Sequence, residues 1–184
     1  MNRRHSWSDV ALALLLAGCT RSAAVESTRP TVPREAAVYA AAIEYLFVRS
    51  DTRQLLVAAQ TAPRLWRFAA HDSTGAKPET WRAFAAHNQS PKPIPSWLPL
   101  KVRVAFADAP PPRLGESGRR GFVGYPDADG WIEVSGIGFD DSGSEAIVAA
   151  FSSCAGLCGN GGVLILRLRD DVWRVVSQPV QVQT

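Results

Sequence analysis

Two cysteines near the C-terminal end, Cys154 and Cys158, are the residues whose type and spacing could most directly do chemistry. The glycines around them permit the sharp turn that brings two Cα atoms within the ~4.4–6.8 Å a disulfide requires. The same pair could act as a thiol redox couple or, with His71 or His87 as a third ligand, hold a copper ion. The choice depends on the compartment, because disulfides persist in oxidising environments.

The remaining candidate groups lack a local signature. Asp127-Ala128-Asp129-Gly130 followed by Glu133 matches only a fragment of a calcium-binding loop, and a turn that enters a strand explains it equally well. Ser152 and Ser153 offer hydroxyl groups, yet no G-x-S-x-G elbow links them to a histidine. We therefore assign no catalytic, metal-binding or cofactor-binding residue, and we predict no cofactor.

The chain has three cysteines, and the sequence around the N-terminal one, Cys19, indicates a separate role for it. Cys154 and Cys158 then remain as a pair in the body of the chain. Arg3 and Arg4 precede a short apolar run, and Leu16-Ala17-Gly18-Cys19 closes it. This segment resembles the lipobox signal peptide of bacterial lipoproteins, which are cut just before the cysteine. The resemblance implies that residues 1–18 are removed and that Cys19 carries fatty acyl chains such as palmitate, an effectively permanent membrane anchor.

An anchor of this kind implies the bacterial cell envelope. By analogy with lipoproteins of Gram-negative bacteria, Thr20 after Cys19 favours the outer membrane, with the protein facing the periplasm. Residues 19–32 are rich in Ser, Thr, Ala and Arg, and we predict that they form a flexible tether. In this oxidising space we predict a disulfide between Cys154 and Cys158.

The copper interpretation rests on a further resemblance. A C-x3-C pair with a distant histidine is similar to the motif of thioredoxin-like copper chaperones. Those proteins place the motif before a helix, whose N-terminus lowers the pKa of a cysteine. Here the pair runs into Gly159-Asn160-Gly161-Gly162 and a strand, so the disulfide is the preferred prediction.

The rest of the chain has the proportions of one globular domain, predicted over residues 33–184. The full chain has 184 residues, of which 46% are hydrophobic and 20% are charged, and this composition suits a single buried core. The net charge of the full chain is +3, and after residue 18 the basic residues are scattered singly apart from Arg119 and Arg120. Since no basic stripe with interleaved aromatic residues is present, we predict no nucleic-acid partner.

Hydrophobic periodicity predicts an α+β fold. Tyr39, Ile43 and Leu46 share one face of a helix over residues 33–48. We expect this N-terminal helix to pack on an antiparallel sheet that ends in a four-strand meander, because short connections allow only antiparallel neighbours. The expected meander strands span 131–139, 145–152, 163–169 and 172–182; the other elements are a strand over 54–61, a helix over 78–88, a strand over 101–107 and an irregular loop over 108–130.

The C-terminal half also resembles an uncharacterised group of bacterial secreted and lipid-anchored proteins. The group carries an S-R-V-G-F strand, an A-L-V strand and a C-G-x-L-C-G-x-G hairpin. This chain has S-G-I-G-F at 135–139, A-I-V at 146–148 and C-A-G-L-C-G-N-G at 154–161, and so departs at Gly136 and Ala155. The resemblance implies a shared fold and carries no activity.

These observations favour a non-enzymatic binding or envelope-maintenance module. One alternative is an envelope enzyme or small-ligand carrier with a helix-sheet cleft, by fold analogy with nuclear-transport-factor-like domains. Another is a copper or thiol-redox protein that uses Cys154 and Cys158. The expected partners are the membrane, through the anchor, and an unidentified envelope protein or small ligand. A pocket lined by converging polar side chains would favour the carrier, and a flat apolar patch the module.

Overall fold

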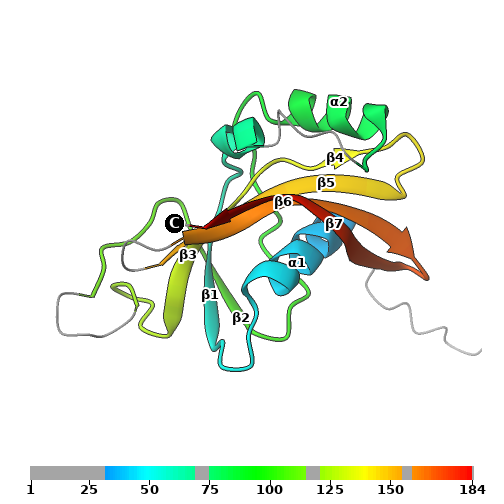
Figure 1. Ribbon diagram of the computed structural model, residues 1–184. Helices are drawn as coiled ribbons and strands as arrows, with labels where there is room; N and C mark the ends of the chain where they lie inside the picture. The colour runs from blue at the N-terminus through cyan, green and yellow to red at the C-terminus, as the bar shows by residue number, and fades with distance from the viewer. Residues whose placement is uncertain (1–31, 69–74, 115–120, 155–158, 184) are drawn as a thin grey trace, which may run out of the picture. The chain divides into compact units, whose positions relative to one another are not determined.

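The computed structural model describes residues 32–68, 75–114, 121–154 and 159–183 (Figure 1). The predicted signal peptide, Cys19 and all but the last residue of the predicted tether lie outside this part of the chain. Cys158 and His71 also lie outside it. Among the described residues, no helix is both long enough and apolar enough to cross a membrane.

The fold class is α+β, as the sequence predicted. In the part of the chain that the structure describes, two α-helices and a short 3₁₀ helix accompany seven strands that belong to one sheet. The elements are α1 (Arg34–Phe47), β1 (Gln54–Ala58), η1 (Pro63–Phe68), α2 (Pro78–His87), β2 (Arg103–Ala107), β3 (Ala128–Val134), β4 (Gly138–Phe139), β5 (Glu145–Cys154), β6 (Gly159–Arg169) and β7 (Val172–Gln183).

The sheet is mixed, which corrects the prediction of an antiparallel sheet. Its strand order is β2-β1-β3-β5-β6-β7, and β4 pairs with β5. Strand β1 lies parallel to both β2 and β3, whereas the pairs β3–β5, β5–β6 and β6–β7 are antiparallel. The connections from β1 to β2 and from β2 to β3 are long enough for the crossovers that parallel neighbours require. The prediction was wrong here because it considered only the short connections near the C-terminus.

Helix α1 forms where the sequence is rich in alanine, and Pro33 stands at its N-cap, where a missing N–H is tolerated. It ends before Val48, whose backbone is extended. The helix therefore matches the predicted range to within one residue at each end. Its apolar face, which includes Ile43 and Leu46, belongs to the same buried cluster as Leu164 and Leu166 of β6.

Helix α2 belongs to a second apolar cluster, with Phe84 buried beside Ile147, Val163 and Ile165. Because successive strand residues point to opposite faces, this cluster lies on the other side of the sheet from α1. Figure 1 shows the two helices on opposite sides of β5 and β6. Helix α1 thus packs on one face of the sheet and helix α2 on the other.

The strand predicted over 131–139 is interrupted in the structure, since β3 ends at Val134 and β4 begins at Gly138. A Cβ atom at Gly138 would collide with backbone atoms of α2 at Thr80 and Phe84. Gly138 therefore lets α2 lie directly against β4. This close approach explains the second glycine of the S-G-I-G-F segment as a packing requirement.

The β6–β7 hairpin has a two-residue turn at Asp170-Asp171, between the strands predicted over 163–169 and 172–182. Asp170 and Asp171 have φ values of 50° and 59°, and two consecutive positive φ angles define a type I′ turn. This turn matches the twist of the flanking strands. Strand β7 lies at the edge of the sheet. Pro179, which has no backbone N–H, therefore removes no hydrogen bond between two inner strands.

Candidate functional site

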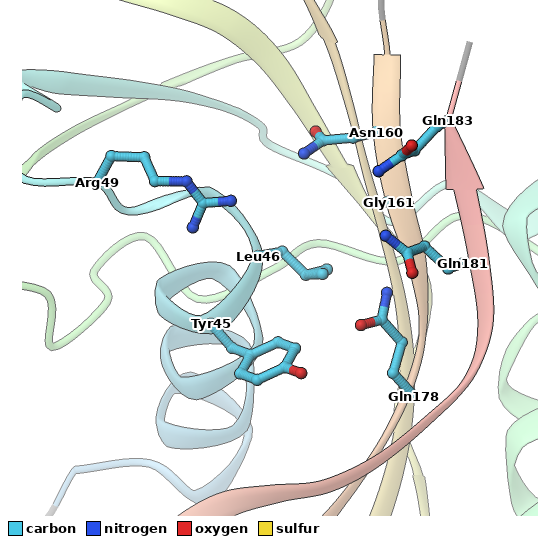
Figure 2. Close-up of a pocket in the computed structure, with 8 residues that line it drawn as sticks. All are labelled: Tyr45, Leu46, Arg49, Asn160, Gly161, Gln178, Gln181 and Gln183. Atoms are coloured by element: carbon cyan, nitrogen blue, oxygen red, sulfur yellow. The ribbon is translucent and has the colours of Figure 1, made fainter.

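A pocket lies between the C-terminal end of α1 and the strands β6 and β7 (Figure 2). Its volume is about 220 Å³. Most of the lining side chains are polar. Among the described residues, eight line it: Tyr45, Leu46, Arg49, Asn160, Gly161, Gln178, Gln181 and Gln183.

One wall of the pocket comes from the end of α1. Tyr45 and Leu46 stand in its last turn, and Arg49 follows directly after the C-cap. Leu46 is buried and belongs to the core cluster, so it supplies an apolar base that is held in place by packing. Tyr45 is 52% exposed. The last turn of the helix therefore presents an aromatic ring, and the segment that follows the helix presents a guanidinium group.

The opposite wall comes from β6 and β7. Gln181 and Gln183 are two residues apart in β7, so their side chains share one face of the strand. Gln178 joins them where the β6–β7 register shifts, between the pairs Val163–Val180 and Ile165–Ser177. A regular ladder through this stretch would alternate its side chains strictly between the two faces. Because of the register shift, the carboxamide of Gln178 can lie on the same wall as those of Gln181 and Gln183.

Glycine in β6 makes room for this wall. A Cβ atom at Gly162 would stand 2.7 Å from Nε2 of Gln178 and would collide with the carbonyl oxygen of Val180. A larger residue at position 162 would thus displace the Gln178 carboxamide. The glycine-rich start of β6, which the sequence interpretation treated as turn chemistry around the cysteines, also shapes the pocket.

The polar groups of the lining are free to bind a ligand. The side chains of Arg49, Asn160, Gln178, Gln181 and Gln183 make no hydrogen bond or ion pair with the described part of the chain. Figure 2 shows the carboxamides directed into the pocket from the strands, with Arg49 extending toward Asn160 and the Tyr45 ring toward Gln178. Four carboxamides and one guanidinium group therefore converge without partners among the described residues.

A second polar cluster, at the junction of α2 with β5, has the opposite character. The Glu145 carboxylate is 1% exposed and accepts hydrogen bonds from the Lys77 backbone N–H at 2.7 Å, Thr80 Oγ1 at 3.0 Å and Arg167 Nε at 3.0 Å. Burial alone would raise the pKa of Glu145, but these hydrogen bonds outweigh it and hold the pKa below its usual range. Lys77 is the N-cap residue of α2, so Glu145 satisfies a backbone donor at that terminus.

Asp140 belongs to the same cluster and is equally well satisfied. Its side chain is 1% exposed, and Lys77 Nζ lies 2.6 Å from its Oδ2. Burial would raise the pKa of Asp140, yet hydrogen bonds from Lys77, Ser142 and the Ser144 and Glu145 backbone hold the pKa well below its usual range. The hydrogen bond to Asp140 raises the pKa of Lys77. Every partner here belongs to the protein, which is the pattern of a structural cluster.

Buried polar groups also connect both helices to the break between β3 and β4. The Tyr39 hydroxyl donates to the carbonyl of Ser135 at 3.1 Å, and the Asn88 side chain binds the backbone N–H and carbonyl of Gly136. Burial raises the pKa of Tyr39, with a smaller contribution from the negative charge of Glu35. These bonds satisfy backbone groups that leave the ladder at this break.

The structure gives His87 a structural contact. Its Nδ1 lies 2.6 Å from the carbonyl oxygen of Ile137, which can only accept, so Nδ1 carries the proton and donates. Asp127 forms an ion pair with Arg103 at 2.6 Å. No group of three or more His, Cys, Asp or Glu side chains in the described ranges is arranged to hold a metal ion. The calcium fragment therefore has a simpler explanation in this ion pair and the start of β3.

The predicted cysteine sites stay predictions. Cys154 is the last residue of β5, while Cys19 and Cys158 lie outside the described residues. Ser152 and Ser153 lie in β5, opposite Asn160 and Gly159 of β6. Neither serine lines the pocket.

The sequence interpretation missed the pocket residues. The strand predicted over 172–182 contains Gln178 and Gln181 and ends before Gln183, and the sequence analysis names none of these glutamines as a site. Their alternation with valine was the available signal, because it predicts a polar face on a strand that is otherwise apolar.

Comparison with known proteins finds no matching family model, no similar curated protein and no similar solved structure. The function is therefore inferred from the geometry of this chain alone.

Proposed function

We propose that this protein is a small-ligand carrier, which the sequence analysis gave as the alternative to a binding or envelope-maintenance module, and that it takes a small polar ligand into the pocket between α1, β6 and β7. The observation that carries the proposal is the convergence of four carboxamides and the Arg49 guanidinium, none of them bonded to the described part of the protein. Polar groups held in one concave site without protein partners are available for a ligand. The N-terminal helix packed on the C-terminal meander is the scaffold in this proposal.

The composition of the lining supports binding over catalysis. Its eight residues include no carboxylate, imidazole, thiol or aliphatic hydroxyl group. General acid–base catalysis needs a group that gains or loses a proton near the working pH, and covalent catalysis needs a nucleophile. Carboxamides and a guanidinium group instead recognise a ligand through hydrogen bonds.

The cell envelope is the proposed location, with Cys19 as the lipid anchor and an oxidised Cys154–Cys158 pair. The support is the lipobox-like segment Leu16-Ala17-Gly18-Cys19 and the cysteine count. A ligand-binding domain on a flexible tether would sample ligands near the membrane surface.

A thermal-shift experiment on the full-length chain tests the binding proposal. The probes are neutral monosaccharides, sugar acids, amino acids and inorganic phosphate. A ligand at 100 times its Kd stabilises the folded state by about 2.7 kcal/mol, which raises the Tm of a domain this size by roughly 5–10 °C. We expect at least one probe class to give such a shift.

Two variants locate the binding. Gln181→Trp fills the pocket and should abolish the shift. Val176→Trp adds the same side chain at an exposed position of β7 that does not line the pocket, and should leave the shift unchanged. Absence of any shift, or a shift that survives in Gln181→Trp, would contradict the proposal.

Intact-mass analysis of the protein from bacterial membranes tests the location. We expect cleavage before Cys19, added acyl mass, and no free thiol until a reductant is added. A Cys154→Ser, Cys158→Ser double variant should lose about 2 kcal/mol of stability, because the closed loop is short. An unprocessed N-terminus, or two free thiols in the isolated protein, would contradict this assignment.

A further inference from the structure

We infer that the pocket between α1, β6 and β7 recognises a carboxylated monosaccharide unit, with Arg49 binding its carboxylate and the carboxamides binding its hydroxyl groups. This inference rests on the proposed binding function and names the ligand class. It follows from the charge, donor and acceptor inventory, and size of the lining.

The charge of the lining selects an anion. Arg49 is the single formally charged residue among the eight lining residues, and its guanidinium group forms no ion pair with the described residues. A guanidinium group matches a carboxylate with two parallel hydrogen bonds. Because the lining holds no carboxylate, a ligand ammonium group would find no counter-charge, which disfavours free amino acids.

The carboxamides select hydroxyl groups. Each side-chain amide offers two donors and one acceptor with two lone pairs. A sugar hydroxyl both donates and accepts, so it can use either end of a carboxamide. Asn160, Gln178, Gln181 and Gln183 supply four such groups along one wall. Sulfate would use only donors of the lining, and phosphate at neutral pH has at most two hydroxyl groups, so either ion would leave most of the amide oxygens without partners.

The opposite wall suits the apolar face of a sugar ring. Tyr45 is 52% exposed and its ring points toward Gln178 in Figure 2, beside the buried Leu46. A phenol ring offers a flat apolar surface with one polar tip. A pyranose placed between this wall and the carboxamides would have its C–H groups on Tyr45 and Leu46 and its hydroxyl groups toward β7.

The size of the pocket limits the ligand to one ring. Its volume of about 220 Å³ lies below the ~300–1,000 Å³ of pockets that hold drug-sized ligands. Arg49 and Asn160 stand toward one end in Figure 2, with Tyr45 and Gln178 toward the other. The carboxylate of the bound unit therefore lies near Arg49, and its ring lies beside Tyr45.

Titration calorimetry on the full-length protein tests this inference with five probes: D-glucuronate, its methyl ester, its methyl glycoside, D-glucose and inorganic phosphate. We expect glucuronate to bind tightest, at least about 10-fold tighter than its methyl ester, since charge-assisted hydrogen bonds are the strong ones. The methyl glycoside of glucuronate distinguishes two sources of the ligand. If it binds as tightly as glucuronate, the ligand is a chain-terminal unit; if it does not bind, the ligand is the free sugar acid. Both results support the inference provided that glucuronate itself binds.

A matched pair of variants identifies the group that reads the charge. Arg49→Gln should lower the affinity for glucuronate about 10- to 100-fold and change the affinity for the methyl ester less than about 3-fold. Arg53→Gln removes the same charge from a nearby exposed position outside the pocket and should change neither affinity. Circular dichroism of both variants controls for folding.

Distinct results separate the two proposals. Binding of another probe class that Gln181→Trp abolishes would keep the binding function and overturn the carboxylated sugar. Equal affinity for glucuronate and its ester, phosphate binding tighter than glucuronate, or an Arg49→Gln variant with unchanged glucuronate affinity would also overturn it. Absence of any Gln181-dependent binding would overturn both.

Discussion

The two polar clusters of this domain, one on each side of the sheet, are built from similar groups but are satisfied in different ways. At the junction of α2 with β5, two buried carboxylates bind Lys77 and Arg167 and several further donors of the same chain. At the end of α1, one guanidinium group and four carboxamides face a pocket and bind nothing in the described chain.

The difference separates structure from function. A buried charge that lacks partners destabilises the folded state, so a fully bonded cluster belongs to the stability of the domain. A half-exposed polar group that lacks protein partners carries little such cost, because water satisfies it until a ligand arrives. We therefore expect substitutions in the α2–β5 cluster to change stability, and substitutions in the pocket to change binding.

The largest expected effect is that of Glu145→Ala. The substitution leaves Arg167, Thr80 and the backbone N–H of Lys77 without their buried acceptor, so we expect the free energy of unfolding to fall by about 3–5 kcal/mol. Urea denaturation measures it. The control is Glu44→Ala, on the exposed face of α1, which should change stability by no more than about 0.5 kcal/mol. Equal losses in the two variants would erase the proposed difference between the clusters.

Acid should destabilise the domain through the same cluster. Asp140 and Glu145 have lower pKa values when folded than their unfolded values of about 3.9 and 4.3. The folded state therefore binds fewer protons in this range. The contribution to stability is fully present above about pH 5 and is lost as the pH falls through the folded pKa values.

The measurement is the free energy of unfolding at a series of pH values from 7 to 2. Glu145→Ala should show a shallower decrease than the unmodified protein, because one of the two carboxyl groups is gone. Parallel curves for the two proteins would mean that other carboxyl groups cause the acid sensitivity.

The smallest effect on stability should come from the pocket. Gln181→Ala removes an exposed carboxamide that has no partner in the described chain, so the free energy of unfolding should change by no more than about 0.5 kcal/mol. Affinity for the best-binding probe should fall about 3- to 10-fold, the value of one neutral hydrogen bond. A loss of stability comparable to that of Glu145→Ala would assign Gln181 to the scaffold instead of the site.

Several elements were predictable because their signals are local. The apolar residues of α1 recur with helical spacing, and the two aspartates at 170–171 indicate a tight turn, so both features were found close to their observed positions. The parallel pairing of β1 with β2 and β3 was not predicted. Pairing across long connections depends on the packing of the intervening helix, and no local pattern encodes it.

The candidate site was not predictable for a related reason. Gln181 and Gln183 alternate with valine, but polar residues on an edge strand ordinarily face water, and Gln178 joins them only through the register shift. They become a site only because Tyr45 and Arg49, far away in the sequence, stand opposite them. The cysteines drew attention first because reactive side chains are conspicuous in a sequence, whereas carboxamides are not.

The sequence by itself determined the α+β class, the position of both helices and the tight turn between the last two strands, because each depends on residues that are neighbours along the chain. Tertiary structure alone decided which strands run parallel, where Gly138 admits α2, and that α1 ends beside the glutamines of β7. The physical reason is that hydrophobic periodicity indicates which face of a helix or strand is buried, but does not indicate which distant part of the chain covers that face.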